Sequence, residues 1–228
     1  SSAASDVYKR QLYDLLKRSE SHVVSLSDRI KKEFVARGID STNVSVLPCG
    51  IDTDLYTLDE TDVLYPDRSI VVGKIEPRKR QAFLQHKDLN IDFIGNNTDS
   101  SFDELDPHYL GEQSKQDIMD NLTAYASMVL LSSGEAHPFV CLEGMAAGLG
   151  LVLSEQSTAN LDISQPFITV IPDDKLDDTT YLDQKIKENR KISLTMRNDI
   201  RKYCFDNFDW SSIIKQYKSI IDSISVSY

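Results

Sequence analysis

The chain has 228 residues, of which 40% are hydrophobic and 27% are charged. This composition allows one sizeable buried core and excludes a disordered or fibrous protein. The formal net charge of −11 counts against a nucleic-acid-binding protein, because so acidic a surface repels phosphate backbones. Any local cluster of basic residues stands out against this background.

Three cysteines, Cys49, Cys141 and Cys204, lie far apart and form no paired motif, which favours reduced thiols in an intracellular protein. No apolar run approaches the roughly 20 residues that span a bilayer. No signal peptide is visible at the start of the sequence. We therefore expect a cytoplasmic protein without a transmembrane segment, and peripheral attachment of the full-length protein to a membrane stays open.

The first eleven residues have an unusual pattern. Residues 6–11 read DVYKRQ, which is the peptide encoded by the end sequence of a widely used sequencing transposon. We interpret residues 1–11 as translated adapter and expect the natural gene to continue upstream of Leu12. The alternative is a chance hexapeptide at the start of an amphipathic helix.

From Leu12 onward, short apolar runs alternate with helical patterns. Strands are expected at 22–27, 43–48, 69–73, 91–95, 128–132, 151–154 and 167–172. Helices are expected at 12–17, 27–38, 79–86, 114–124, 139–147, 180–190, 193–206 and 210–225. Continuously apolar strands separated by helices predict a Rossmann-like, doubly wound α/β domain whose parallel sheet is covered on both faces.

Two loops of such a domain matter most, because ligands bind beyond the carboxyl ends of its strands. The loop 73–80 holds four basic residues that can present charge to a phosphate group, and they are Lys74, Arg78, Lys79 and Arg80. A solvated basic turn explains this cluster equally well. The loop contains neither GxGxxG nor a P-loop signature, which disfavours ordinary dinucleotide-binding and ATPase interpretations.

The second loop, 132–140, leads from one glutamate to another. Glu135 follows a strand, and Pro138 is placed to begin a helix whose first N–H groups face the same crevice. Glu143 lies beyond the first turn of that helix. The two carboxylates can bind separate sets of sugar hydroxyls, while the helix N-terminus attracts a diphosphate between them. Small residues follow at 144–150, as close packing of a helix on a sheet requires.

These features together resemble the C-terminal donor-binding domain of the retaining GT-B glycosyltransferases of family four. The resemblance runs from about Val23 to Tyr217, in family order and at family spacing. Its motifs are SLS (25–27), LPCGID (47–52), GKIEPRK (73–79), FIG (93–95), Glu-x7-Glu (135–143), GMAAGLGLVLSE (144–155) and FDW (208–210). It implies the C-terminal half of a GT-B fold and a hexosyltransferase-like enzyme that transfers a sugar from a nucleotide diphosphate with retention of configuration.

The resemblance also implies roles for individual residues. Lys74 and Lys79 match the basic pair that holds the donor diphosphate, although the family usually has Arg at the first position, and Lys lacks its bidentate fork. Glu135 matches the residue that contacts the transferred sugar, and Glu143 the residue that binds the ribose. We expect Lys74, Lys79 and Glu135 to be catalytic. The expected donor-binding residues are Gly73, Arg78, Ala136, His137, Phe139, Val140 and Glu143.

The expected chemistry needs no cofactor and no metal ion. Breaking a sugar–phosphate bond leaves negative charge on the departing diphosphate, and two lysines with a helix N-terminus can stabilise that charge. The sequence shows no cluster that resembles a metal site. The partners expected are a nucleotide sugar and an acceptor that is a glycan, a lipid or a small molecule, with no nucleic acid.

The resemblance predicts the domain organisation as well. Residues 12–42 are expected to be the remnant of an N-terminal acceptor domain and its linker, 43–208 the donor-binding domain, and 209–228 a crossover helix. Because the acceptor site would lie in the missing domain, we expect this chain to bind the donor but to be inactive alone. The apolar face of the last helix is expected either to cover residues 22–37 or to make the chain self-associate.

Two alternative functions stay open. A non-catalytic nucleotide-sugar-binding module would keep the donor site without its chemistry. A nucleotide-sugar 2-epimerase has the same fold, but it needs catalytic carboxylates and histidines that we cannot place, and its motifs differ from GKIEPRK.

Overall fold

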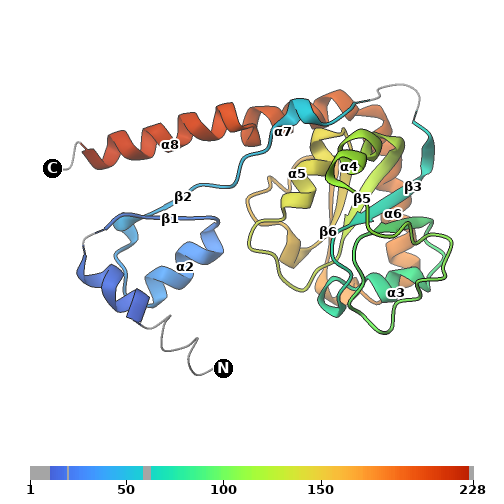
Figure 1. The fold of residues 1–228 in the computed structure, drawn as a ribbon, viewed down its shortest axis with the longest axis horizontal. Coiled ribbons are helices and arrows are strands. Elements are labelled where there is room, and N and C mark those ends of the chain that lie inside the picture. The colour runs from blue at the N-terminus through green and yellow to red at the C-terminus, as the bar shows by residue number, and fades with distance from the viewer. Residues whose placement is uncertain (1–10, 20, 59–62, 226–228) are drawn as a thin grey trace.

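The main body of the molecule is a five-stranded parallel sheet with helices on both faces (Figure 1). The computed structural model describes residues 11–19, 21–58 and 63–225. The strands are β3 (Tyr65–Val72), β4 (Ile91–Ile94), β5 (Tyr125–Leu130), β6 (Gly150–Ser154) and β7 (Ile168–Ile171). The helices are α3 (Gln81–Gln85), α4 (Lys115–Asn121), α5 (Phe139–Ala146), α6 (Thr179–Thr195) and α7 (Arg197–Phe208). The predicted doubly wound α/β fold is confirmed.

Alternation along each strand divides the core between the two faces of the sheet. Ile70 and Val72 of β3 belong to a cluster that includes residues of α4, α5 and α7. Val71, which lies between them, belongs to a second cluster with residues of α3 and α6. Because both faces are buried, these strands are continuous apolar runs in the sequence, and this is why the pattern located them.

The strand order, β4-β3-β5-β6-β7, places a topological switch point between β3 and β5. The chain passes from β3 outward to β4 and then returns to the other side of β3 to form β5. The connections that leave β3 and β5 therefore separate at one point of the carboxyl edge. Both loops singled out in the sequence, 73–80 and 132–140, begin there.

A smaller unit precedes the main body and lies apart from its sheet (Figure 1). Its strands β1 (Val23–Ser25) and β2 (Val44–Val46) pair in parallel, with Val23 opposite Val44, and α2 (Asp28–Ala36) connects them. The expected boundary between residues 42 and 43 divides this unit. The strand β2, which we assigned to the donor-binding domain, instead finds its hydrogen-bond partner in β1.

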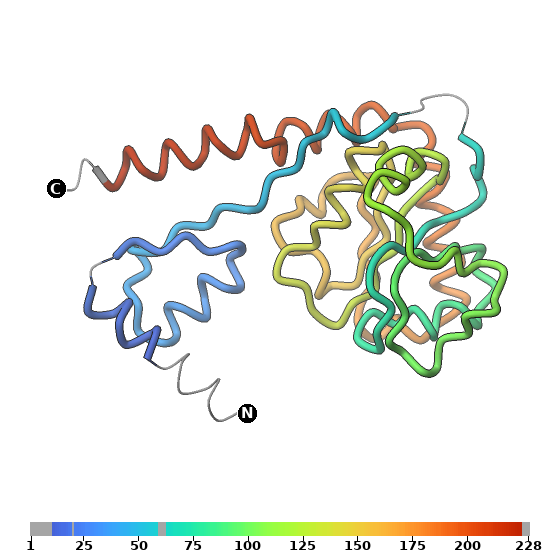
Figure 2. Tube along the Cα trace, viewed as in Figure 1, coloured from blue at the N-terminus to red at the C-terminus, as the bar shows by residue number. Residues whose placement is uncertain are grey.

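Two segments cross between the small unit and the main body, and they run side by side near Ile51 (Figure 2). One follows β2, and the other is the start of α8 (Trp210–Ser225). The Ile51 N–H donates to Phe208 O at 2.8 Å, and the Trp210 N–H donates to Ile51 O at 3.0 Å. The Trp210 ring packs on Gly50, where an added Cβ would lie 2.6 Å from the indole.

The helix α8 does not cover residues 22–37, so this part of the expectation is wrong. Its side chains Ile214 and Tyr217 are 48% and 46% exposed, and α2 contains no buried residue. In Figure 1, α8 runs back from the main body, with β1 and β2 drawn between it and α2. Within the described residues, no helix has the length and apolar character needed to cross a membrane.

Candidate functional site

The two loops that leave the switch point are tied to each other directly. The first contains a short 3-10 turn, Pro77–Lys79, and the second runs from Leu131 to Pro138 at the start of α5. The Ser133 N–H donates to the carbonyl oxygen of Arg78 at 2.8 Å. The residues predicted from the two loops therefore lie at one place on the carboxyl edge of the sheet.

The two lysines of the first loop have different surroundings. Lys79 is half-buried, and its ammonium group lies over Gly73, where an added Cβ would be 3.0 Å from Nζ. Gly73 itself has a φ of +129°, a conformation that L side chains rarely adopt. Lys74 is exposed, and its carbonyl oxygen accepts a hydrogen bond from Nε2 of the buried Gln81 at 3.0 Å. The loop thus fixes the backbone of Lys74 and the ammonium group of Lys79.

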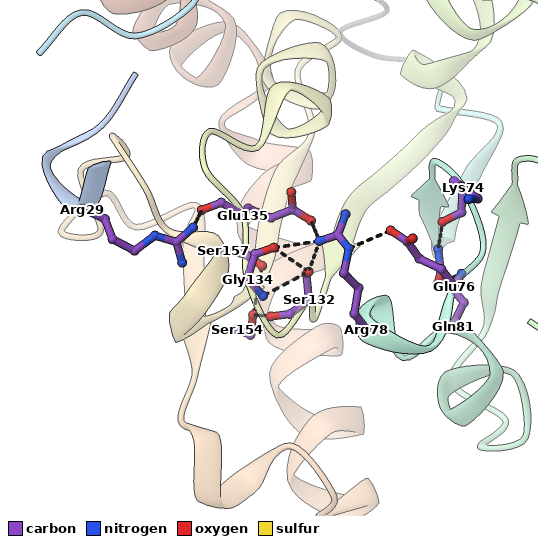
Figure 3. A network of polar contacts seen from close by, with 10 residues as sticks. All are labelled: Arg29, Lys74, Glu76, Arg78, Gln81, Ser132, Gly134, Glu135, Ser154 and Ser157. Atoms are coloured by element: carbon purple, nitrogen blue, oxygen red, sulfur yellow. Dashed lines mark hydrogen bonds and ion pairs between the residues drawn. The ribbon is translucent and has the colours of Figure 1, made fainter. Parts of the chain in front are cut away.

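Arg78 joins the two loops through its guanidinium group (Figure 3). Its Nε lies 2.8 Å from Glu76 Oε1. Its Nη1 lies 2.9 Å from Glu135 Oε1, and donates to Ser132 Oγ at 3.0 Å and to Gly134 O at 2.7 Å. The positive charge of Arg78 is therefore flanked by two carboxylates.

Glu135 is held through its backbone as well as its carboxylate. Its N–H donates to Gln156 O at 3.2 Å, which connects it to the segment after β6. Its carbonyl oxygen accepts from Nη2 of Arg29 at 2.9 Å, and Arg29 belongs to α2 of the small unit. Figure 3 shows the two arginines on opposite sides of Glu135.

A cluster of buried serine hydroxyls holds the start of the second loop against the end of β6. Ser154 Oγ donates to Ser132 O at 2.6 Å and lies 2.9 Å from Ser157 Oγ. All three serines have no exposed surface. Because buried polar groups need partners, these bonds hold the ends of β5 and β6 in a fixed relation beneath Glu135.

Glu143 lies one turn inside α5, where its carboxylate is half-buried. The Tyr56 hydroxyl donates to Glu143 Oε1 at 3.0 Å. Arg201 holds Tyr56 in place by donating to its carbonyl oxygen at 2.6 Å. Burial raises the pKa of Glu143, while the Tyr56 hydrogen bond and the charge of Lys115 act in the opposite direction. Burial, together with Glu143, raises the pKa of Tyr56, so this hydroxyl stays a donor.

The thiol of Cys141, in the first turn of α5, is fully buried, and charged residues of the two loops and of α5 act on its pKa. Burial is the largest cause of its raised pKa, and the charges of Glu135 and Glu143 raise the pKa further. The charge of Lys79 lowers it. Both glutamates and one lysine therefore act on a single buried atom, although they come from different loops.

The approach to α5 leaves backbone donors at its N-terminus. Pro138 has φ −77° and ψ 82°, close to an inverse γ-turn, and the Phe139 N–H donates to His137 O at 2.9 Å. In the part of the chain that the structure describes, the N–H groups of Ala136 and His137 donate to no protein acceptor. Those two N–H groups, beside the N-terminal end of a helix, suit an anion.

The side chain of His137 faces the segment that crosses from the small unit. Its Nδ1 lies 2.9 Å from Asn160 Nδ2, and its Nε2 lies 3.4 Å from Cys49 O. Since Asn160 Nδ2 is a donor and Cys49 O an acceptor, these partners select the neutral tautomer with hydrogen on Nε2. Burial lowers the pKa of His137, which also favours the neutral ring.

The structure thus brings Lys79, Glu135 and Glu143 together, with Lys74 exposed at the same edge. Phe139 is 39% exposed, whereas Val140 packs against the core. Sequence reasoning missed the residues that contact the predicted ones: Arg29, Tyr56 and Gln156 contact the glutamates, and Gln81 and Ser132 contact Lys74 and Arg78. Only their position in the folded chain connects them to the site, since they belong to no shared local motif.

The fold is that of GT-B glycosyltransferases, in the part of it that this chain spans. Comparisons with protein-family models and with curated proteins found no match. Among solved structures, Anabaena HepE in complex with UDP-glucose matches with a TM-score of 0.71 and 18% identity, over 94% of this chain and 67% of that one.

Two further solved structures show the same likeness. The lipopolysaccharide outer core galactosyltransferase WaaB matches with a TM-score of 0.69 and 16% identity, over 92% of this chain and 66% of that one. Sucrose-phosphate synthase from Thermosynechococcus elongatus matches with a TM-score of 0.69 and 15% identity, over 95% and 61%. The chain spans about two thirds of the length of these proteins or less.

Proposed function

We propose that this chain is the donor-binding part of a glycosyltransferase, which binds a nucleotide-diphosphate sugar at the switch point and transfers the sugar with retention of configuration. The observation that carries the proposal is the junction of the two loops at the switch point, where the Ser133 N–H donates to Arg78 O and Arg78 pairs with Glu135, at the start of the helix that carries Glu143. Solved neighbours support it, because HepE was determined with UDP-glucose and WaaB is a galactosyltransferase.

The charges of the site suit the reaction. When the bond between the anomeric carbon and the phosphate oxygen breaks, the electron pair stays with the diphosphate. Lys74, Lys79 and the N-terminal end of α5 lie at one edge to stabilise that charge. In this proposal no metal ion or cofactor takes part.

The two glutamates suit the two sugars of the donor. Glu135 is in the loop beside Arg78, and we assign it to the hydroxyls of the transferred sugar. Glu143 is on the helix with Tyr56 behind it, and we assign it to the ribose. Ala136 and His137 offer backbone donors between these positions, while Gly73 leaves room beside Lys79.

Calorimetric titration of this chain with UDP, ADP, GDP and their sugars tests the proposal. One nucleotide is expected to bind, and Lys79→Gln should weaken its binding about tenfold or more, because a charge-assisted contact to phosphate is lost. Lys202→Gln, which removes the same charge from an exposed site on α7, should leave binding unchanged. A chain that binds none of these nucleotides contradicts the proposal.

A measurement of turnover distinguishes a glycosyltransferase from the two alternative functions. The product of the full-length gene is expected to hydrolyse its donor slowly to the free sugar and the nucleoside diphosphate. Donor binding without hydrolysis or transfer would identify a non-catalytic binding module. The appearance of an epimerised nucleotide sugar would identify a 2-epimerase.

A further inference from the structure

We propose that Arg29 and Arg78 are positioning residues which together fix Glu135, so that recognition of the sugar depends on how the small unit is seated on the donor site. The inference rests on the proposed function, since it concerns the glutamate that we assign to the transferred sugar. It gives Arg78 a different role from that of a diphosphate ligand.

The first argument for a positioning role is the charge balance around Arg78. Its Nε pairs with Glu76 at 2.8 Å and its Nη1 with Glu135 at 2.9 Å, so one cation stands between two carboxylates. The net charge of the three groups is negative, which does not attract a diphosphate. Lys74 and Lys79 remain for that purpose.

Geometry carries the second step. The same Nη1 that contacts Glu135 also donates to Ser132 Oγ and Gly134 O, so the carboxylate is held against the loop in which it lies. The guanidinium is 43% exposed, and exposed ion pairs add little to stability. These contacts therefore serve orientation more than folding.

Arg29 carries the third step, because it acts on Glu135 from outside the donor-binding domain. It is the second residue of α2, and it reaches 106 residues along the chain to the carbonyl oxygen of Glu135 at 2.9 Å. Asn160 adds a neighbouring link, since its Nδ2 donates to Leu26 O at 2.7 Å. A shift of the small unit moves Arg29 and thereby releases the carbonyl oxygen of Glu135.

The experiment compares the affinity of each variant for the nucleotide that binds with its affinity for the corresponding nucleotide sugar. Arg78→Gln is expected to weaken nucleotide-sugar binding about tenfold while nucleotide binding stays within about twofold, because only the sugar-contacting carboxylate is released. Arg29→Gln is expected to act in the same direction by about threefold. Arg78→Lys should not restore the sugar-dependent part, since Lys lacks the planar fork that reaches Glu76 through Nε and Glu135 through Nη1.

Two matched controls and a double-mutant cycle complete the test. Lys87→Gln removes a positive charge just after α3, where Lys87 lies over Phe83, and Arg37→Gln alters the residue that follows α2, where Arg37 lies over Tyr13. Neither should change the ratio of the two affinities. In a Glu135→Gln background the effect of Arg78→Gln should disappear, since the two residues act through one contact.

Three results would overturn the inference. If Arg78→Gln weakens nucleotide and nucleotide-sugar binding by the same factor, and Arg78→Lys restores both, Arg78 binds the diphosphate. If neither arginine variant changes the ratio, both are structural. If the wild-type chain binds a nucleotide and its nucleotide sugars with the same affinity, Glu135 does not contact the sugar. Failure of the chain to bind any nucleotide, by contrast, refutes the proposed function itself.

Discussion

Glu143 illustrates, at the scale of a single residue, how a binding group can be costly to the fold. Burial raises the pKa of its carboxyl group above the ordinary value for a glutamate. The folded protein therefore binds the proton more tightly than the unfolded chain does. The stability that the Glu143 carboxyl group contributes is fully present at pH values below its pKa in the unfolded chain. This contribution is lost as the pH rises through its pKa in the folded protein.

The first prediction concerns Glu143→Gln. The variant is expected to be more stable than the wild type at pH 7, because the neutral amide avoids the burial of a charge, and equally stable at about pH 4. Its affinity for the nucleotide should fall about tenfold with the loss of charge-assisted contacts to the ribose. Thermal melting at both pH values and calorimetric titration measure these effects.

Glu33→Gln is the matched control, since Glu33 is exposed on α2 and the variant changes the net charge equally. It should alter neither property. A Glu143→Gln variant that binds the nucleotide normally and melts lower at pH 7 would show that the carboxylate serves the fold instead.

The sequence indicated the charged residues of the candidate site more clearly than the residues that hold them in place. Lys79 and Glu135 stand in loops that follow strands, and Glu143 lies on the next helix, so pattern and resemblance both proposed them. Tyr56 contacts Glu143 across 87 residues of sequence, and Arg29 contacts Glu135 across 106. Nothing local marks such residues, because their partners are set by tertiary packing.

At the scale of the elements, the sheet depends on a close approach between the ends of β3 and β4. Gly95 has a φ of +146°, and an added Cβ would lie 2.1 Å from the carbonyl oxygen of Gly73. The N–H of Gly73 donates to Ile94 O at 2.9 Å, which extends the pairing of the strands into the loop 73–80. A side chain at Gly95 would therefore disturb the backbone beneath Lys79.

The second prediction compares two glycines with positive φ. Gly95→Ala should destabilise the protein by at least about 3 kcal/mol, because the methyl group clashes with the backbone. Gly111→Ala should cost only about 1 kcal/mol, since its φ is +74° but no atom lies within 4 Å of the added Cβ. Chemical denaturation measures both. Equal losses would show that backbone conformation, and not the contact with Gly73, decides the effect.

Most elements were predicted within a few residues, because apolar strands and amphipathic helices have different periods. The largest differences are at the end of α6 and at the starts of β3 and α7, and the start of β5 follows. Helix α6 continues to Thr195, five residues beyond the prediction, with the polar side chains of Asn189 and Ser193 fully buried. Asn189 Nδ2 donates to Leu151 O and Phe167 O, and a burial of this kind is invisible in a hydrophobic pattern. Strand β5 begins at Tyr125, where the sequence showed no unbroken apolar run.

At the scale of the whole molecule, the outer face of α8 is exposed and apolar. Ile214 and Tyr217 are both about half exposed, and Val24 and Leu26 of the small unit are 44% and 41% exposed. Apolar surfaces of this kind favour association with a partner. The sequence predicted that α8 would need one, but it could not show that the small unit is not that partner.

The third prediction is that this chain self-associates through α8. Sedimentation velocity over a range of concentrations should show the wild type shifting toward larger species. Ile214→Lys combined with Tyr217→Lys should reduce that shift and leave the melting temperature nearly unchanged, because both side chains already face solvent. Lys215→Glu and Lys218→Glu, which alter the charge of the same helix, are the control for electrostatic effects. A wild type that stays monomeric at every concentration contradicts the prediction.

The paired crossing at Ile51 and Asp209 limits how the small unit can move. A single connecting segment would leave three rotations free, whereas two segments that are hydrogen-bonded to each other act as one hinge. The remaining freedom is a swing about the line through that bridge. Such a swing carries Arg29 toward or away from Glu135 along one path, so, in the role that we propose for Glu135, recognition of the sugar depends on a single opening angle.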